Sequence, residues 1–331
     1  TRRGDAGETA AVDAAAAFEF AHCSAANHAS SPAGDPACPS ALLVAIDASP
    51  SCKLRGPLNF SGVASPALVQ EFDAKLAAMI AAQGNCTPAP VIAFSHYPLS
   101  VIRYPRTPAK GETLPEVLQR HGTAAYLSGH LHAAFGQRLH RLHRSSAASL
   151  PMMELETASW KYERRFRLLT VDGAEVSFAD LEFRPHQHDE PPPSPPGTPP
   201  QTCASLHPPG PIVPVDATRA VRDWVVLITS PADGRYGAPP LQAGASAPPV
   251  RAMVLPASSA AAAGDVPQPR ACWACAAGEP REVCTPMEAR RGGEAGNPAR
   301  RHALFEAAAE MPTCPAGTAL TLQVPPLSPP P

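Results

Sequence analysis

Three histidines that follow two short apolar runs could do metal chemistry. Val91–Phe94 precedes His96, and residues 124–127 precede His130 and His132. Each run is typical of a buried strand, so the histidines are expected on loops at the carboxyl ends of neighbouring strands, where α/β proteins place their chemistry. Neutral imidazole is a common ligand of transition metals, so the pattern predicts most of one side of a two-metal site. The alternative is that these are ordinary solvated loop histidines.

The surrounding segments predict the elements that would carry these loops. A strand is expected at residues 42–46. Apolar residues at helical spacing predict a helix over residues 66–83, with Ser65 as N-cap and Gly84 at its end. A second helix is expected over residues 113–121, between the two histidine loops.

Further strands are expected along the rest of the chain. Residues 152–156, 164–171 and 175–183 are predicted to be antiparallel strands, with Asp172-Gly173 as a hairpin turn between the last two. Candidate strands of a small β-sandwich follow at residues 224–229, 250–255 and 319–324.

The two histidine loops also resemble a known family. Ser95-His96-Tyr97-Pro98, followed by Ser128-Gly129-His130-Leu131-His132, looks like the last two motifs of the calcineurin-like metallophosphoesterases. The resemblance implies an α/β fold, the second half of a four-layer α/β/β/α sandwich. It implies that His96 and His130 share one metal ion, that His132 holds its neighbour and that Tyr97 lines the pocket. The implied reaction is metal-assisted hydrolysis of a phosphoester with two divalent ions, of Mn, Fe or Zn.

Other segments resemble the transmembrane protein 62 family, namely residues 44–48, 57–62, 159–167, 177–181 and 223–231. That family joins a phosphoesterase domain to an immunoglobulin-like β domain and then to membrane spans. The implied organisation is a phosphoesterase part over residues 1–184, a linker over 185–220 and an immunoglobulin-like domain with insertions over 221–331. Residues 1–40 include a low-complexity insertion.

Three motifs of the superfamily, D-x-H, G-D-x-x-[DN] and G-N-H-[DE], do not occur in the sequence. The chain begins with Thr1, so we expect it to be the C-terminal portion of a longer protein. Three neutral imidazoles bring no negative charge to offset two divalent ions. This chain alone is therefore expected to bind one ion weakly or none, and to be inactive as an enzyme. The alternative function is a catalytically inactive lumenal scaffold that engages a protein partner through its β domain.

Proline is abundant, with 43 of 331 residues against a usual share of about 5%. It is concentrated between Pro185 and Pro214, where the tract cannot form helix or central strand. An extended linker is the favoured interpretation, and a ligand for a proline-recognition domain is the alternative.

The composition also indicates which binding partners and which cellular compartment to expect. The net charge of −2 gives no reason to expect nucleic acid or an anionic membrane surface as a partner. Among nine cysteines, Cys272, Cys275 and Cys284 favour a disulfide or free thiols over a zinc site. Two glycosylation sequons, at Asn59 and Asn85, favour a lumenal or extracellular segment in the secretory pathway. No run of 18 apolar residues occurs, so any membrane spans are expected beyond this chain.

Overall fold

The computed structural model describes residues 41–49, 60–132, 140–144, 151–183, 224–231, 249–256, 268–275, 283–289 and 303–307, and the backbone of 15–20, 212–214 and 320–323. The chain divides into two units. Unit 1 comprises Thr1–Cys23 and Pro36–Ala158, and unit 2 comprises Ser24–Asp35 and Ser159–Pro331. The domain boundaries expected at residues 184 and 221 stay predictions.

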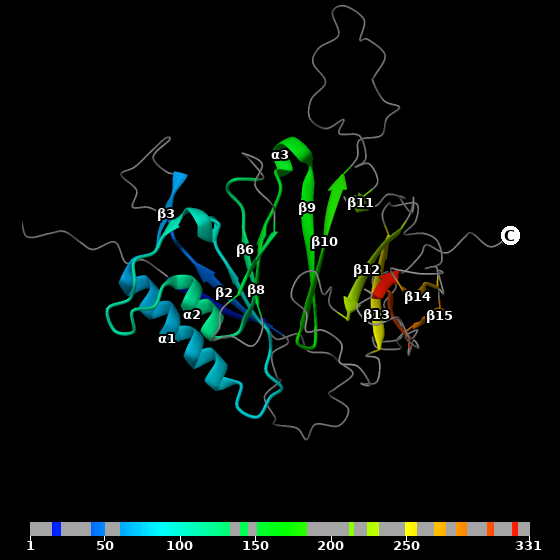
Figure 1. Ribbon diagram of the computed structural model, residues 1–331, viewed down its shortest axis with the longest axis horizontal. Helices are drawn as coiled ribbons and strands as arrows, with labels where there is room; N and C mark the ends of the chain where they lie inside the picture. The colour runs from blue at the N-terminus through cyan, green and yellow to red at the C-terminus, as the bar shows by residue number, and fades with distance from the viewer. Residues whose placement is uncertain are drawn as a thin grey trace, which may run out of the picture. The chain divides into compact units, whose positions relative to one another are not determined.

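Unit 1 is built on a six-stranded mixed sheet in the order β1-β2-β4-β6-β8-β7 (Figure 1). Its strands are β1 (Ala15–Phe20), β2 (Ala41–Ile46), β4 (Val91–Phe94), β6 (Thr123–Ser128), β7 (His140–His143) and β8 (Met152–Glu156). The four inner strands run parallel, and β1 and β7 pair antiparallel at the two edges. Two short strands, β3 (Gly62–Val63) and β5 (Ile102–Arg103), form a separate parallel pair.

The two helices of unit 1 begin as the sequence predicts. Helix α1 (Pro66–Ala82) starts after Ser65, whose Oγ accepts a hydrogen bond from the Leu68 N–H at 3.1 Å. Helix α2 (Leu114–Arg120) starts after Thr113, which forms a capping box with Glu116. Gly84 and Gly122, just past the helix ends, have φ of +56° and +67°, a conformation that glycine adopts without strain.

The core of unit 1 lies between these helices and the sheet. Helices α1 and α2 lie over one face of the sheet (Figure 1). The buried side chains of α1 are apolar and recur at helical spacing: Leu68, Val69, Phe72, Leu76 and Met79. They pack with buried residues of β2, β4 and α2. This mixed α/β unit with its parallel sheet fits the phosphoesterase half that the resemblance implies.

The prediction that β8 pairs antiparallel with the strands after it is wrong. Strand β8 instead joins the sheet of unit 1, parallel to β6 from Ala125 opposite Met153 to Ser128 opposite Glu156. All five residues of β8 are buried. Inner strands of a parallel sheet are buried on both faces. The position of β8 between β6 and β7 therefore accounts for the burial of all its residues, including the two glutamates.

In unit 2, β9 (Arg165–Asp172) and β10 (Glu175–Phe183) form a hairpin, with β11 (Ile212–Pro214) at the outer edge of β10. Asp172 pairs with Glu175, so the turn is Gly173-Ala174, one residue later than predicted. Strand β11 ends the proline-rich tract, and residues 185–211 lie outside the described residues.

The remaining strands of unit 2 form two small sheets, ordered β12-β13-β17-β16 and β15-β14-β18. They are β12 (Trp224–Ser230), β13 (Val250–Pro256), β14 (Arg270–Cys275), β15 (Val283–Pro286), β16 (Glu288–Ala289), β17 (Ala303–Ala307) and β18 (Leu320–Gln323). The three strands predicted here are confirmed, but the immunoglobulin-like arrangement stays a prediction. Cys272 and Cys284 form a disulfide between β14 and β15, which confirms the disulfide interpretation for this pair.

Unit 2 also contains a short helix, α3 (Trp160–Glu163). In the part of the chain that the structure describes, no helix is long and apolar enough to cross a membrane.

Candidate metal centre

The loops that follow β4 and β6 bring two of the predicted histidines together. Hydrogen bonds continue past both strand ends, from Ser95 N to Leu127 O at 3.0 Å and from Gly129 N to His96 O at 3.1 Å. The Nε2 atom of His96 lies 3.1 Å from Nδ1 of His130, and the ring centroids are 5.0 Å apart. Adjacent parallel strands therefore place the two imidazoles at one edge of the sheet, as the sequence predicts.

Backbone carbonyls fix the tautomers of two histidines. The Nε2 atom of His130 lies 2.9 Å from the carbonyl oxygen of Phe60, and Nδ1 of His132 lies 2.9 Å from that of Thr157. A carbonyl oxygen can only accept, so each of these nitrogens carries the proton. In the neutral rings the lone pairs are then on Nδ1 of His130 and Nε2 of His132. Metal-binding histidines commonly donate their other ring N–H in this way.

The spacing of the His96–His130 pair fits the binding of one metal ion, but the pair alone is not a complete set of ligands. Two nitrogens at about 2.0–2.1 Å from one ion are about 3.0–3.4 Å apart in octahedral or tetrahedral geometry. The separation of 3.1 Å between the facing nitrogens of His96 and His130 matches this spacing. Among the described residues, however, no group of three or more His, Cys, Asp or Glu side chains is placed to hold an ion. His132 is not part of the close pair, and its role as a ligand stays a prediction.

The protonation of His96 favours ligation. Partial burial lowers the pKa of His96, and the neighbouring His130 and His132 lower it further because a second positive charge would be repelled. The imidazole is therefore more fully neutral near pH 7 than an ordinary histidine. Neutral imidazole is the form that binds a metal.

The backbone of the H-x-H loop adopts a conformation that is rare outside glycine. His130 has φ of +80° and His132 has φ of +52°. Non-glycine residues adopt positive φ at a cost of about 1–3 kcal/mol, and such residues cluster at functional sites. The surrounding contacts must therefore hold this loop in place.

Two buried glutamates of β8, for which the sequence predicted no role, contact the two loops. Glu156 Oε1 accepts hydrogen bonds from the Leu131 N–H at 2.6 Å and the His132 N–H at 2.8 Å. Glu154 Oε1 accepts one from the Leu99 N–H at 2.7 Å. Burial raises the pKa of Glu156, and the two backbone N–H groups partly offset that rise. The signal in the sequence was two acidic residues, i and i+2, inside the predicted strand over residues 152–156.

The Tyr97 ring contacts both histidines of the pair. Its side chain is buried, with ring centroids 4.8 Å from His96 and 4.6 Å from His130. The hydroxyl of buried Tyr126 donates to the Tyr97 carbonyl at 2.8 Å. Tyr97 thus supports the imidazoles by packing, and its role as a pocket residue stays a prediction. A Cβ on Gly62 would lie 2.8 Å from the Tyr97 ring and 2.9 Å from the carbonyl oxygen of Ala48, so this contact requires glycine.

Of the two predicted glycosylation sites, only Asn85 falls among the described residues. It is exposed in the turn after α1, and its neighbour Cys86 is disulfide-bonded. Asn59 lies outside the described residues. Modification at either position stays a prediction.

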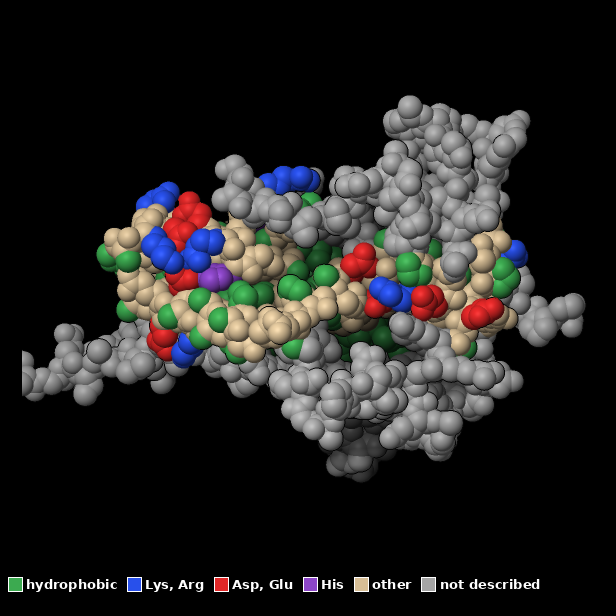
Figure 2. All heavy atoms as spheres, turned by 90° about the horizontal axis from the view of Figure 1, so that it is seen from below, with side chains coloured by type: hydrophobic (Ala, Val, Ile, Leu, Met, Phe, Trp, Pro, Cys, Tyr) green, Lys and Arg blue, Asp and Glu red, His purple; other side chains and the backbone are tan. Residues whose placement is uncertain are grey.

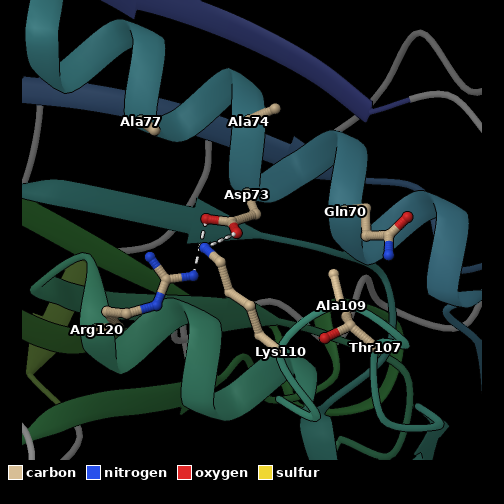
Figure 3. A pocket seen from close by; sticks show the side chains of 8 residues that line it. All are labelled: Gln70, Asp73, Ala74, Ala77, Thr107, Ala109, Lys110 and Arg120. Carbon is tan, nitrogen blue, oxygen red and sulfur yellow. Dashed lines mark hydrogen bonds and ion pairs between the residues drawn. The ribbon is translucent and has the colours of Figure 1, made fainter.

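A second polar cluster in unit 1 lies between α1 and α2, beside a cavity of about 310 Å³ (Figure 3). Asp73 Oδ1 lies 2.8 Å from Arg120 and 2.6 Å from Nε2 of His121, and Oδ2 lies 2.9 Å from Lys110. Burial alone would raise the pKa of Asp73, but hydrogen bonds from His121, Arg120 and Lys110 outweigh it and hold the pKa well below its usual range. On the face shown in Figure 2, basic and acidic side chains are likewise interspersed.

Two curated proteins resemble this chain. It is 28% identical over 172 residues to "Putative metallophosphoesterase At3g03305" of Arabidopsis thaliana, covering 43% of this chain and 22% of that protein. It is 32% identical over 146 residues to Transmembrane protein 62 of Mus musculus, covering 42% of this chain and 19% of that protein. The chain thus spans about a fifth of the length of these relatives. No protein-family model and no solved structure matches it. These similarities relate the chain to the calcineurin-like phosphoesterases, which confirms the resemblance seen in the two histidine motifs.

Proposed function

We propose that this chain carries part of the metal site of a phosphoesterase, with His96 and His130 as ligands of one divalent ion and His132 as a ligand of its neighbour. The reaction class is metal-assisted hydrolysis of a phosphoester. The observation that carries the proposal is the facing pair of ring nitrogens, Nε2 of His96 and Nδ1 of His130, 3.1 Å apart at the sheet edge.

The contacts of each imidazole support these roles. Donation from His130 to the Phe60 carbonyl directs the His130 lone pair to Nδ1, the atom that faces His96. Donation from His132 to the Thr157 carbonyl directs its lone pair to Nε2, on the other side of the ring. The two residues of one H-x-H loop thereby present lone pairs on different ring nitrogens, which suits ligation of two different ions.

The chemistry supplied by such ions is Lewis-acid polarisation of a phosphoryl oxygen and generation of a nucleophile from water. This chain's contribution is to hold neutral, oriented nitrogen donors at a rigid sheet edge. Three imidazoles leave the positive charge of two divalent ions uncompensated, so the proposal requires carboxylate ligands other than the described residues around the pair. We therefore expect this chain by itself not to hydrolyse a generic aryl phosphate.

The relatives also suggest a cellular location for this chain. One of them is named a transmembrane protein, and we propose that the present segment belongs to a membrane-anchored protein with its phosphoesterase part in the lumen. A phosphoester is the proposed substrate class, and the β-strand-rich unit 2 is a candidate surface for a protein partner.

The test is Co²⁺ binding to the whole chain, followed by visible absorption and by equilibrium dialysis. We expect His96→Ala and His130→Ala to weaken binding by at least about 100-fold, because each removes a direct ligand. His121→Ala is the matched control, since His121 contacts Asp73 and precedes the amino end of β6, whereas His96 and His130 follow carboxyl ends of strands. The proposal narrows the expectation for this chain to one weakly bound ion, so failure of the wild type to bind Co²⁺, or equal losses in His121→Ala and His130→Ala, would contradict it.

A further inference from the structure

We infer that Glu154 and Glu156 of β8 are positioning residues, each of which holds one of the two histidine loops in its ligand-presenting conformation. The inference rests on the proposed function for its purpose, but the contacts behind it do not involve a metal. Both carboxylates are buried, with 5% of Glu154 and 4% of Glu156 exposed. Each directs an oxygen at backbone N–H groups of a different loop.

Glu156 binds the backbone of the H-x-H loop. Its Oε1 accepts hydrogen bonds from two successive backbone N–H groups, those of Leu131 and His132. Leu131 lies between the two residues with positive φ, His130 and His132, and the second donor is the N–H of His132 itself. A charged acceptor makes hydrogen bonds about twice as strong as a neutral one. Glu156 therefore supplies the interaction best placed to offset the backbone strain of this loop.

Glu154 serves the other loop, two residues earlier on the same strand. Its Oε1 accepts from the Leu99 N–H, three residues after His96, and Oε2 lies 2.6 Å from Nε2 of His143 on β7. His143 thereby holds the carboxylate from the opposite side. Residues i and i+2 of a strand point to the same face, so one strand places both carboxylates toward the two loops.

The next residue after Glu156 completes the arrangement. The Thr157 N–H donates to the Ser128 carbonyl at 2.9 Å, and the Thr157 carbonyl receives the ring N–H of His132. The end of β8 thus fixes the backbone of the H-x-H loop through Glu156 and its second imidazole through Thr157. The inner position of β8 beside β6 makes this possible, and an antiparallel β8 in another sheet could not provide it.

The test is residue-resolved amide hydrogen exchange on the whole chain, without metal, for Glu156→Leu and Glu154→Leu. Leucine is similar in size to glutamate but cannot accept a hydrogen bond, so the facing N–H groups lose their partner. We expect Glu156→Leu to speed exchange of the His132 amide by at least about 10-fold and leave Leu99 unchanged, and Glu154→Leu to do the reverse. General destabilisation would instead speed both loops and α1 together.

A second measurement links the contacts to metal binding. Loss of an outer-sphere partner typically costs 10- to 100-fold in metal affinity. We therefore expect Glu156→Leu to weaken Co²⁺ binding by about that factor and Glu156→Gln, which retains an acceptor oxygen, to recover most of it. Glu71→Gln, on the exposed face of α1, is the control and should change nothing.

The outcomes separate the two proposals. Unchanged exchange of the His132 amide in Glu156→Leu overturns the positioning role of Glu156, whatever the metal result. Equal Co²⁺ affinity in wild type and Glu156→Leu overturns its link to ligand presentation. If the wild type binds no Co²⁺ but the reciprocal exchange pattern is seen, the proposed function fails while the positioning contacts stand.

Discussion

Two polar clusters of unit 1 differ in what their histidines contact. Between α1 and α2, His121 lies 2.6 Å from the Asp73 carboxylate, which also pairs with Arg120 and Lys110. At the ends of β4 and β6, His130 contacts another imidazole and a backbone carbonyl. The first cluster is an ion-pair network between two helices. The second brings ring nitrogens of two imidazoles face to face, 3.1 Å apart.

The difference shows how a structural histidine can be distinguished from a candidate ligand. The Asp73 carboxylate is held between cationic partners, so the network needs no added ion to be stable. The facing nitrogens of His96 and His130 contact each other, and a cation between them would bind the lone pairs of both neutral rings. We therefore expect the helix cluster to contribute to folding and the strand-end cluster to contribute to binding.

The largest effect on stability is expected for Asp73→Asn. The change removes the charge that compensates Lys110 and Arg120 in a site where the carboxylate is only 17% exposed. Breaking a partly buried network of this kind costs about 2–3 kcal/mol in the free energy of unfolding. Urea denaturation measures this loss, and Co²⁺ affinity should stay within about twofold of wild type. A large fall in Co²⁺ affinity without loss of stability would break the distinction between the clusters.

The same network predicts an acid dependence. The pKa of Asp73 is lower in the folded chain than its ordinary value of about 3.9, so its contribution to stability is fully present above about pH 4 and is lost as the pH falls toward the folded value. The difference in unfolding free energy between wild type and Asp73→Asn should therefore shrink as the pH falls below 4. A difference that grows below pH 4 would contradict this assignment.

Much of unit 1 could be predicted from local sequence signals. Ser65 before Pro66, and the buried apolar stripe of α1, are strong local patterns, and both are confirmed. The runs before His96 and His130 are short and fully apolar, as inner strands of a parallel sheet must be, so the edge at which the histidines meet was also predictable.

The roles of Glu154 and Glu156 could not be predicted in the same way. Acidic residues in a strand usually indicate a solvated face, and burial of both depends on loops that are 55 and 24–25 residues away in sequence. The same long-range contacts explain the error in the pairing of β8. The tautomers of His130 and His132 likewise depend on the carbonyls of Phe60 and Thr157, which no local pattern reveals.

A smaller effect that involves the strand-end cluster is expected for Gly62→Ala. The added Cβ would meet the ring of Tyr97 and the carbonyl oxygen of Ala48, so either β3 or the ring must shift. Overpacking of this kind costs about 1–3 kcal/mol, and we expect about 1–2 because β3 is a short strand. Since Tyr97 contacts both His96 and His130, Co²⁺ affinity should fall with stability, unlike in Asp73→Asn. Thermal unfolding and the Co²⁺ titration measure the two effects on the same sample.

The smallest effect is expected for Lys110→Ala, within the helix cluster. Lys110 and Arg120 contact opposite oxygens of the Asp73 carboxylate (Figure 3), but 54% of the Lys110 side chain is exposed against 35% of Arg120. An exposed ion pair is worth about 0.2–1 kcal/mol, because solvent screens it and the long side chain loses rotamer freedom. We expect Lys110→Ala to lower the free energy of unfolding by about 0.3 kcal/mol and Arg120→Ala by more, since Arg120 also binds Glu112.

Raising the salt concentration should remove the Lys110 effect before that of Arg120. Equal, salt-independent losses would mean that the cluster stabilises the helices by packing alone, and its contrast with the strand-end histidines would then rest on geometry and not on charge.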